Sequence, residues 1–206
     1  MSTVRDALVR QFGKPSGFLG AVAGLIMRVR PSNRERNLRT LTLLDVLPTD
    51  HVLELGFGPG LAIARAAELA SRGKVVGLDH SELMLRQARQ RNARAIEGGR
   101  VELLLGSAEH LPTLSIRFDK VFAVNVFMFW SEPVAVLRGV REVMRPGGAI
   151  ALTLQPRRPG ATVDDARKAA EHMATSLRDA GFGDVRVEIL EMTPVEAACV
   201  LGQAPG

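Results

Sequence analysis

Internal disulfide bonds are excluded from this chain, because its 206 residues include a single cysteine, Cys199. A chain that relies on no disulfide is typical of a reducing compartment. No apolar run reaches the roughly 18 residues that a membrane-spanning helix requires. The N-terminal stretch MSTVRDALVRQF is charged and amphipathic, unlike a secretory signal. We therefore expect a cytoplasmic protein.

Internal repeats and low-complexity tracts are also missing, and no His, Asp and Glu cluster has the spacing of metal ligands. We therefore expect no metal site. Apolar residues make up 46% of the chain and charged residues 24%, which is typical of a globular protein of ordinary domain size.

Positive charge is concentrated near the N-terminus. Residues 1–40 contain eight Lys and Arg against two Asp and Glu, a net charge of +6, while the whole chain carries +5. The remaining residues are therefore slightly acidic and offer no broad basic face to a phosphate backbone. We expect no nucleic-acid partner, although a basic segment can contact an anionic membrane, an acidic substrate or only solvent.

The N-terminal region differs in pattern from the rest of the chain. Residues 13–31, GKPSGFLGAVAGLIMRVRP, combine glycines, apolar residues and arginines. Leu38, Leu41 and Leu44 then recur at helical spacing and predict a helix that ends by Pro48. We expect residues 1–40 to form a helical cap and residues 41–206 to form the main domain.

Strand and helix patterns alternate after residue 50. The predicted strands are 51–57, 74–79, 101–107, 118–125, 148–156, 184–190 and 196–202, and the predicted helices between them are 61–70, 81–94, 132–144 and 164–180. The last two strands have no helix between them, so they should pair as a hairpin. The pattern predicts a doubly wound, Rossmann-like α/β fold: a mostly parallel seven-stranded sheet with an antiparallel C-terminal strand and helices on both faces.

A carboxylate and three glycines mark the end of the first predicted strand, in VLELGFGPG at residues 52–60. Ligands of such sheets bind beyond the carboxyl ends of the strands. Glycine permits positive φ and lets a ligand touch the main chain. The spacing is G-x-G-x-G, and Leu61 stands where a dinucleotide-binding loop has a small residue, which argues against NAD(P).

A second carboxylate, Asp79, ends the second predicted strand. A carboxylate at this place can accept two hydrogen bonds from a ribose diol, which predicts a nucleoside ligand without a 2′-phosphate. The alternative is that Asp79 only caps the next helix, although Ser81 already supplies a cap.

These segments resemble the class I S-adenosylmethionine-dependent methyltransferases, in the small-molecule subgroup called methyltransferase type 11. The resemblance spans about residues 48–190 and also rests on VVGLDHSELML, VELLLGSAEHLP, FDKVFAVNVFMFW, LRGVREVMRPGGAIALTL and LRDAGFGDVRVEIL. It implies S-adenosyl-L-methionine as the cofactor. The cofactor-binding residues that it implies are Glu54, Gly56, Phe57, Gly58, Gly60, Asp79, His80, Ser107, Ala108, Glu109 and Asn125.

The resemblance also implies a role for each part of that set. Glu54 would serve the ammonium group, the glycines the methionine part and Asp79 the ribose, while His80 would lie near the adenine. The family usually has an acidic residue where this chain has Ser107, in GSAEHLP. A neutral acceptor makes a weaker hydrogen bond than a carboxylate, so Glu109 is a second candidate for contact with the adenine.

An acceptor pocket is predicted beyond the fourth strand. Asn125 would offer its main-chain carbonyl to the cofactor, and the four residues after Val126 would line the pocket or merely cover the core: Phe127, Met128, Phe129 and Trp130. The Asn-Pro-Pro-Tyr motif of amino-directed methyltransferases is missing. His110 is the candidate general base, and the expected acceptor is a small or lipid-like molecule methylated on oxygen, nitrogen or carbon.

In similar enzymes the N-terminal region covers the site, so residues 13–31 are a candidate lid that could also contact a membrane surface. Three other functions stay open on the sequence: a non-catalytic S-adenosylmethionine-binding sensor, an NAD(P) oxidoreductase and an RNA methyltransferase. The sequence leaves the oligomeric state undetermined.

Overall fold

The computed structural model describes residues 31–206, in which a seven-stranded sheet forms the centre. The strands are β1 (His51–Leu55), β2 (Lys74–Asp79), β3 (Val101–Leu105), β4 (Phe118–Val124), β5 (Met144–Leu154), β6 (Gly183–Leu190) and β7 (Ala197–Gln203). Their order across the sheet is β3-β2-β1-β4-β5-β7-β6. Strands β1 to β5 pair in parallel, and β7 is antiparallel to both of its neighbours. The predicted fold class is confirmed.

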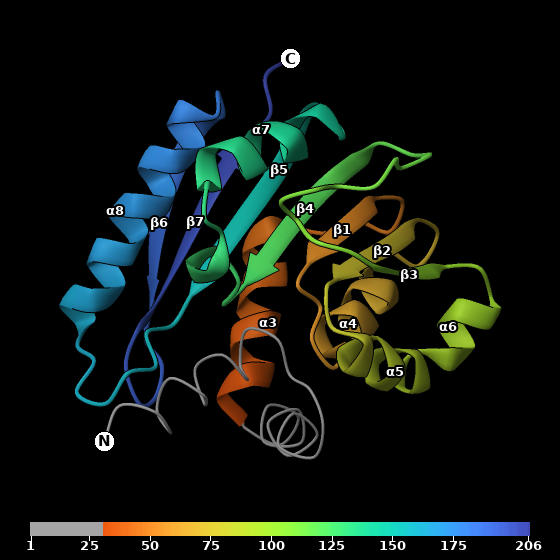
Figure 1. Ribbon diagram of the computed structural model, residues 1–206, viewed down its shortest axis with the longest axis horizontal. Helices are drawn as coiled ribbons and strands as arrows, with labels where there is room; N and C mark the ends of the chain where they lie inside the picture. Colours follow the sequence, from red (N-terminus) through yellow and green to blue (C-terminus); the bar gives the residue numbers. More distant parts are fainter. Residues whose placement is uncertain (1–30) are drawn as a thin grey trace.

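Helices cover both faces of the sheet (Figure 1). They are α3 (Pro31–Leu44), α4 (Leu61–Leu69), α5 (Glu82–Arg91), α6 (Ala93–Glu97), α7 (Pro133–Glu142) and α8 (Val163–Asp179), with a 3-10 turn η1 (Phe127–Phe129) after β4. Helices α7 and α8 contribute to one hydrophobic cluster, and α3, α4 and α5 contribute to the other. The two clusters lie on opposite faces, because a parallel sheet made by crossover helices is buried on both sides.

Strand β1 shows how the sequence builds both clusters. Leu53 and Leu55 belong to the α7–α8 cluster, and Val52 belongs to the α3–α5 cluster, as the two-residue period of a strand requires. Glu54 alternates with Leu53 and therefore lies on the same face as Val52. A carboxylate is thus carried into the apolar α3–α5 side of the sheet.

The elements differ from the sequence-based expectations at several boundaries. The helix predicted over 81–94 is divided at Asn92 into α5 and α6. Strand β5 begins at Met144 and so includes the stretch RPGG, which was expected to separate a helix from a strand. Leu38 was expected on the packed face of its helix, but it is 36% exposed, while Arg36 and Thr40 are buried.

Helix α3 crosses the predicted boundary at residue 40 and contacts α4, β4 and β5. Residues 31–40 of the predicted cap are therefore packed on the main domain. The proposed lid and membrane contact at residues 13–31 lies outside the described residues, apart from Pro31. Within residues 31–206, no helix is both long and apolar enough to span a bilayer.

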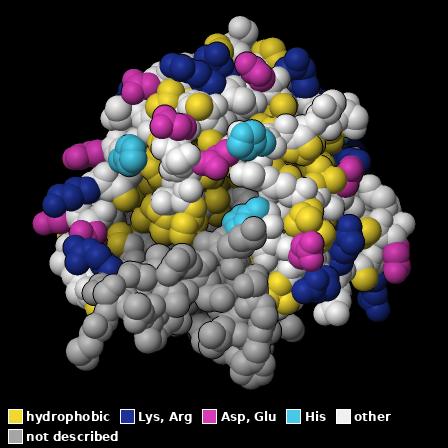
Figure 2. Space-filling model, in the orientation of Figure 1, with side chains coloured by type: hydrophobic (Ala, Val, Ile, Leu, Met, Phe, Trp, Pro, Cys, Tyr) yellow, Lys and Arg dark blue, Asp and Glu magenta, His cyan; other side chains and the backbone are white. Residues whose placement is uncertain are grey.

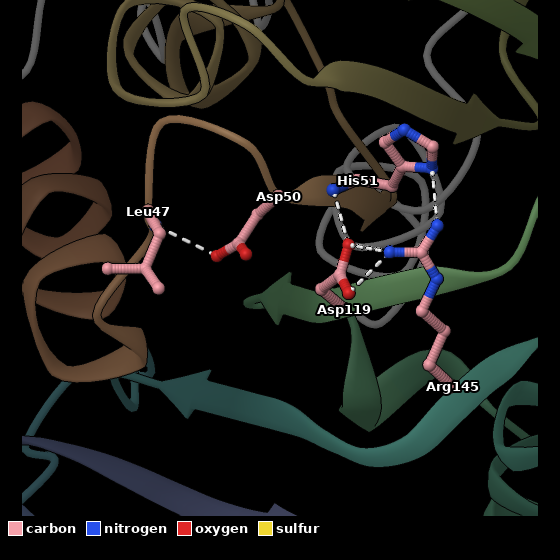
Figure 3. Close-up of polar contacts among 5 residues, drawn as sticks. All are labelled: Leu47, Asp50, His51, Asp119 and Arg145. Carbon is pink, nitrogen blue, oxygen red and sulfur yellow. Dashed lines mark hydrogen bonds and ion pairs between the residues drawn. The ribbon is translucent and has the colours of Figure 1, made fainter.

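The amino ends of three neighbouring strands are joined by one ion-pair cluster (Figure 3). Asp119 of β4 accepts a hydrogen bond from the His51 backbone N–H at 2.7 Å, and its two carboxylate oxygens lie 2.7 and 2.9 Å from Nη1 of Arg145. Nη2 of Arg145 lies 3.4 Å from Nδ1 of His51. The Asp50 carboxylate closes the preceding turn by accepting from the Leu47 N–H at 2.8 Å. The cluster fixes β1, β4 and β5 at the edge opposite their carboxyl ends.

Asp119→Ala should lower the free energy of unfolding by about 1–3 kcal/mol, because hydrogen bonds to charged groups contribute about 1.5–3 kcal/mol and an exposed ion pair adds little. Urea denaturation would measure the change. The control is Glu68→Ala, whose partner is Arg65 and whose side chain is 65% exposed. The stability of that control should stay within about 0.5 kcal/mol of the parent. Equal losses of stability in the two variants would contradict a stabilising role of the ion-pair cluster around Asp119.

Candidate cofactor and acceptor site at the strand tips

The loop between β1 and α4 turns on three glycines in the left-handed backbone region. Gly56, Gly58 and Gly60 have φ values of 74°, 51° and 75°. A Cβ at Gly56 would lie 2.4 Å from a Val126 methyl group, and one at Gly60 would lie 2.7 Å from the Asn92 side chain. A Cβ at Gly58 would meet nothing within 4 Å. Gly58 therefore presents bare backbone to open space, where a ligand can reach the main chain.

The end of α5 holds this loop in place. Arg91 Nε donates to the Pro59 carbonyl at 3.0 Å. The buried Asn92 amide donates to the Gly60 carbonyl at 3.2 Å and to the Ala88 carbonyl at 2.8 Å. Asn92 is also the residue at which α5 ends, so the break in the predicted helix supplies the side chain that fixes the loop.

Asp79 joins the tips of β1 and β2. Its Oδ2 accepts from the Gly58 N–H at 2.8 Å, and its Oδ1 accepts from the Ser81 N–H at 2.9 Å. Burial raises the pKa of Asp79, and the hydrogen bonds from Ser81 and Gly58 oppose that rise. Ser81 caps α5 through its hydroxyl, as expected, and His80 between them is exposed.

Glu54 lies within the same corner and is only 3% exposed. Its Oε2 has no hydrogen-bond partner in the described part of the chain. Burial, followed by the charge of Asp79, raises the pKa of Glu54 well above its usual value, while a hydrogen bond from the Ile63 backbone opposes the shift. Two buried carboxyl groups close to a bare glycine fit a ligand that carries positive charge.

The loop after β3 contains four of the predicted site residues. The Ser107 hydroxyl accepts from the Glu109 N–H at 3.2 Å, and the Ser107 carbonyl accepts from the His110 N–H at 3.1 Å. Glu109 Oε1 accepts from the Ser131 N–H at 2.9 Å and from its hydroxyl at 2.6 Å, which holds the pKa of Glu109 below its usual value. The Glu109 carboxylate thus ties this loop to the segment after β4, while Ala108 is half-buried and His110 is exposed.

Asn125 stands at the tip of β4 in the left-handed region, with φ of 56°. Its N–H donates to the Thr153 carbonyl at 2.8 Å, and its Oδ1 accepts from the Gln155 N–H at 2.8 Å. The side chain therefore links the tips of β4 and β5. Asn tolerates this backbone conformation better than most side chains.

The predicted acceptor-pocket segment is divided by the fold. Phe127 and Trp130 are 5% and 8% exposed, and their ring centroids lie 5.5 Å apart within the α7–α8 cluster. Met128 and Phe129 are instead 48% and 44% exposed. Figure 2 shows hydrophobic side chains gathered in a hollow over η1, with acidic and histidine side chains around it. Two residues of the segment support the core, and two are available to a bound molecule.

Two features of this region were not predicted from the sequence. His172 of α8 is exposed, and its ring lies 5.0 Å from that of Phe127, edge to face. Arg36 and Gln155 are buried beside the tips of β4 and β5. No local sequence pattern predicts the contact of His172 with Phe127 or that of Arg36 with Gln155, because each joins segments far apart in the chain. Among residues 31–206, no group of His, Cys, Asp and Glu could hold a metal ion.

The family described as "Methyltransferase domain" matches residues 52–148. The uncharacterized methyltransferase YdaC of Bacillus subtilis is 29% identical over 184 residues, which cover 89% of this chain and 98% of YdaC. The chain spans only about half of two further relatives. Erythromycin 3''-O-methyltransferase of Saccharopolyspora erythraea is 30% identical, with 68% of this chain and 52% of that protein covered. Demethylmenaquinone methyltransferase of Lactiplantibacillus plantarum is 32% identical, with 62% and 55% covered.

The fold is shared with a solved methyltransferase structure. A SAM-dependent methyltransferase from Aquifex aeolicus superposes with a TM-score of 0.68 at 22% identity and covers 85% of this chain and 94% of its own. The stretch that matches the family includes the glycine loop, Asp79 and Asn125. The cofactor that the family implies, S-adenosylmethionine, is cationic, which agrees with the two buried carboxyl groups beside Gly58. The matched methyltransferase family, the methyltransferase relatives and the shared fold together support a class I S-adenosylmethionine-dependent methyltransferase.

Proposed function

We propose that this methyltransferase acts on a small-molecule or lipid-like acceptor, which lies over the tip of β4 while the cofactor lies across the tips of β1, β2 and β3. The observation that carries the cofactor side is Glu54, a buried carboxyl group with an unpartnered oxygen beside Asp79. S-adenosylmethionine supplies a methyl group on a cationic sulfonium and also carries an ammonium group. Glu54 binds the ammonium side.

The cofactor-binding residues divide by position. Gly56, Phe57, Gly58 and Gly60 form the wall along the methionine part, where the open space over Gly58 supports close approach. Asp79 accepts the ribose hydroxyls, since each carboxylate oxygen can accept a hydrogen bond in addition to the one from Gly58 or Ser81.

The adenine end is bound by the turn after β2 and the loop after β3. His80 and Ala108 flank the ring, and the Ser107 hydroxyl provides a polar contact. Glu109 holds the loop to Ser131, because its Oε1 accepts hydrogen bonds from both the N–H and the hydroxyl of that residue. The main-chain carbonyl of Asn125 contributes from the tip of β4.

The acceptor side is proposed from exposure and from the relatives. Met128 and Phe129 offer apolar surface at the hollow over η1, and Phe127 and Trp130 support them from below. Two relatives are named for methylation of an erythromycin hydroxyl and of demethylmenaquinone, which supports an acceptor with a large apolar body. His110, on the adjoining loop, removes a proton where the acceptor is a hydroxyl.

Glu54→Gln should stabilise the ligand-free protein in a pH-dependent way. The folded-state pKa of Glu54 is raised, so its ionisation disfavours folding: this penalty is absent below the unfolded value of 4.5, grows as the pH rises above it and is complete above the folded pKa. The variant should be more stable than the parent at mildly alkaline pH, by about 1.4 kcal/mol per unit of pKa difference. Urea denaturation across pH would measure this, and a variant less stable at every pH would contradict it.

Asp79→Ala should weaken binding of S-adenosylhomocysteine by about tenfold or more, because it removes hydrogen bonds to a charged group worth about 1.5–3 kcal/mol each. Isothermal titration calorimetry would measure the dissociation constant. Asp119→Ala serves as the control, since that carboxylate lies at the amino edge of the sheet and should leave the affinity unchanged. Unaltered affinity in Asp79→Ala would refute the ribose assignment.

The acceptor class is tested by transfer of a labelled methyl group from S-adenosylmethionine to a demethylmenaquinone, a macrolide with a free sugar hydroxyl and small water-soluble amines. We expect label in one of the first two. His110→Ala should then lower kcat by about 100-fold or more with cofactor affinity unchanged, whereas His51→Ala at the amino edge should retain activity. Label in the amines alone would overturn the proposed acceptor class.

A further inference from the structure

A buried polar cluster lies beyond the end of β5. Gln155 is 0% exposed, and its amide nitrogen donates to the Val195 carbonyl at 2.7 Å and to the Thr193 carbonyl at 3.3 Å. Its Oε1 accepts from Nη1 of Arg36 and, at 2.9 Å, from Nη2 of Arg157. One amide oxygen thus holds two guanidinium groups, and the amide cannot rotate without losing these bonds.

Arg36 is the unusual member of this cluster because it is a buried cation, only 4% exposed. Its Nη2 donates to Asn33 Oδ1 at 2.7 Å, while its Nε has no hydrogen-bond partner. No carboxylate forms an ion pair with Arg36 among residues 31–206. Burial and the charge of Arg157 lower its pKa to about 9. A buried charge without a counter-ion is costly for a fold.

Arg157 extends the positive charge of Arg36 to the surface. It is exposed, and its Nη2 also lies 3.3 Å from Asn33 Oδ1, so the two arginines share both oxygen acceptors. Two guanidinium groups at such short range repel each other. An oxyanion bound beside Arg36 would supply the negative charge that Arg36 lacks.

The cluster is next to the proposed acceptor site. The Gln155 N–H donates to Asn125 Oδ1 at 2.8 Å, and Asn125 is the tip of β4. Arg36, Gln155 and Arg157 all lie outside residues 52–148, the part of the chain that the methyltransferase family matches. Their position therefore suits a feature of this chain's own acceptor rather than the common cofactor.

We infer that Arg36 and Arg157, held by Gln155, form a subsite for an oxyanion of the methyl acceptor, either a carboxylate or a phosphate. The inference rests on the proposed function, because it assigns the acceptor of that same site. Guanidinium groups bind both kinds of oxyanion through paired hydrogen bonds. The acceptor then combines an apolar part on Met128 and Phe129 with an acidic group beyond the tip of β5.

The test uses the full chain saturated with S-adenosylhomocysteine and titrated by calorimetry with sodium propionate or sodium phosphate, so that the two arms separate carboxylate from phosphate. We expect one anion to bind, and Arg157→Gln to weaken it by about tenfold or more. The matched control is Arg158→Gln, which makes the same charge change at an exposed residue paired with Asp165 at 2.6 Å. That control should bind the anion as the parent does.

Arg36→Lys is the second variant, because it keeps the buried charge but loses the guanidinium fork. We expect it to weaken anion binding while leaving the affinity for S-adenosylhomocysteine within about twofold. Binding of neither anion, or equal weakening in Arg157→Gln and Arg158→Gln, would overturn the subsite. Failure of the parent to bind S-adenosylhomocysteine would instead count against the proposed cofactor site, and anion titration of the ligand-free chain would still decide the subsite.

Discussion

Asp79 accepts a hydrogen bond from the backbone N–H of Gly58, and through it the tips of β1 and β2 are held as one surface. The glycine loop depends on this bond, because left-handed glycines alone would leave the loop free to choose among conformations. The bond also fixes the Asp79 carboxylate close to Glu54, whose pKa is raised first by burial and then by the charge of Asp79. The fold therefore places two buried carboxyl groups where the cationic methyl donor is proposed to bind, at a cost in stability to the ligand-free protein.

In the described part of the chain, charged groups are paired at one edge of the sheet and buried without an opposite charge at the other. At the amino edge, Asp119 and Arg145 neutralise each other and join three strands. At the carboxyl edge, Glu54 and Arg36 are both buried without an opposite charge among the described residues. Asn125 lies between these two regions, since it ends β4 and bonds to Gln155. The proposed site has a carboxyl group at one end and a guanidinium group at the other, which suits the alignment of a sulfonium donor with an acidic acceptor.

The residues proposed to bind the cofactor and those proposed to bind the acceptor lie in different parts of the chain. The acids and glycines proposed to bind the cofactor fall within the matched stretch 52–148, whereas the arginine cluster falls outside it. Relatives with this fold carry names that refer to unlike acceptors, a macrolide hydroxyl in one and demethylmenaquinone in another. A shared fold therefore identifies the donor chemistry, and we propose that side chains contributed by α3 and the end of β5 distinguish the acceptor.

Local pattern alone determined the alternating strands and helices, the C-terminal hairpin, and the placing of Glu54, the glycines and Asp79 at strand ends, because side-chain periodicity and glycine spacing are properties of short segments. Tertiary packing decided the rest. It buried Phe127 and Trp130 but exposed Met128 and Phe129, although the four are neighbours. It turned Arg36 inward rather than Leu38, engaged Glu109 with Ser131, and brought His172 against Phe127. Each of these outcomes depends on a partner distant in sequence, and no local pattern encodes which distant segment a side chain will meet.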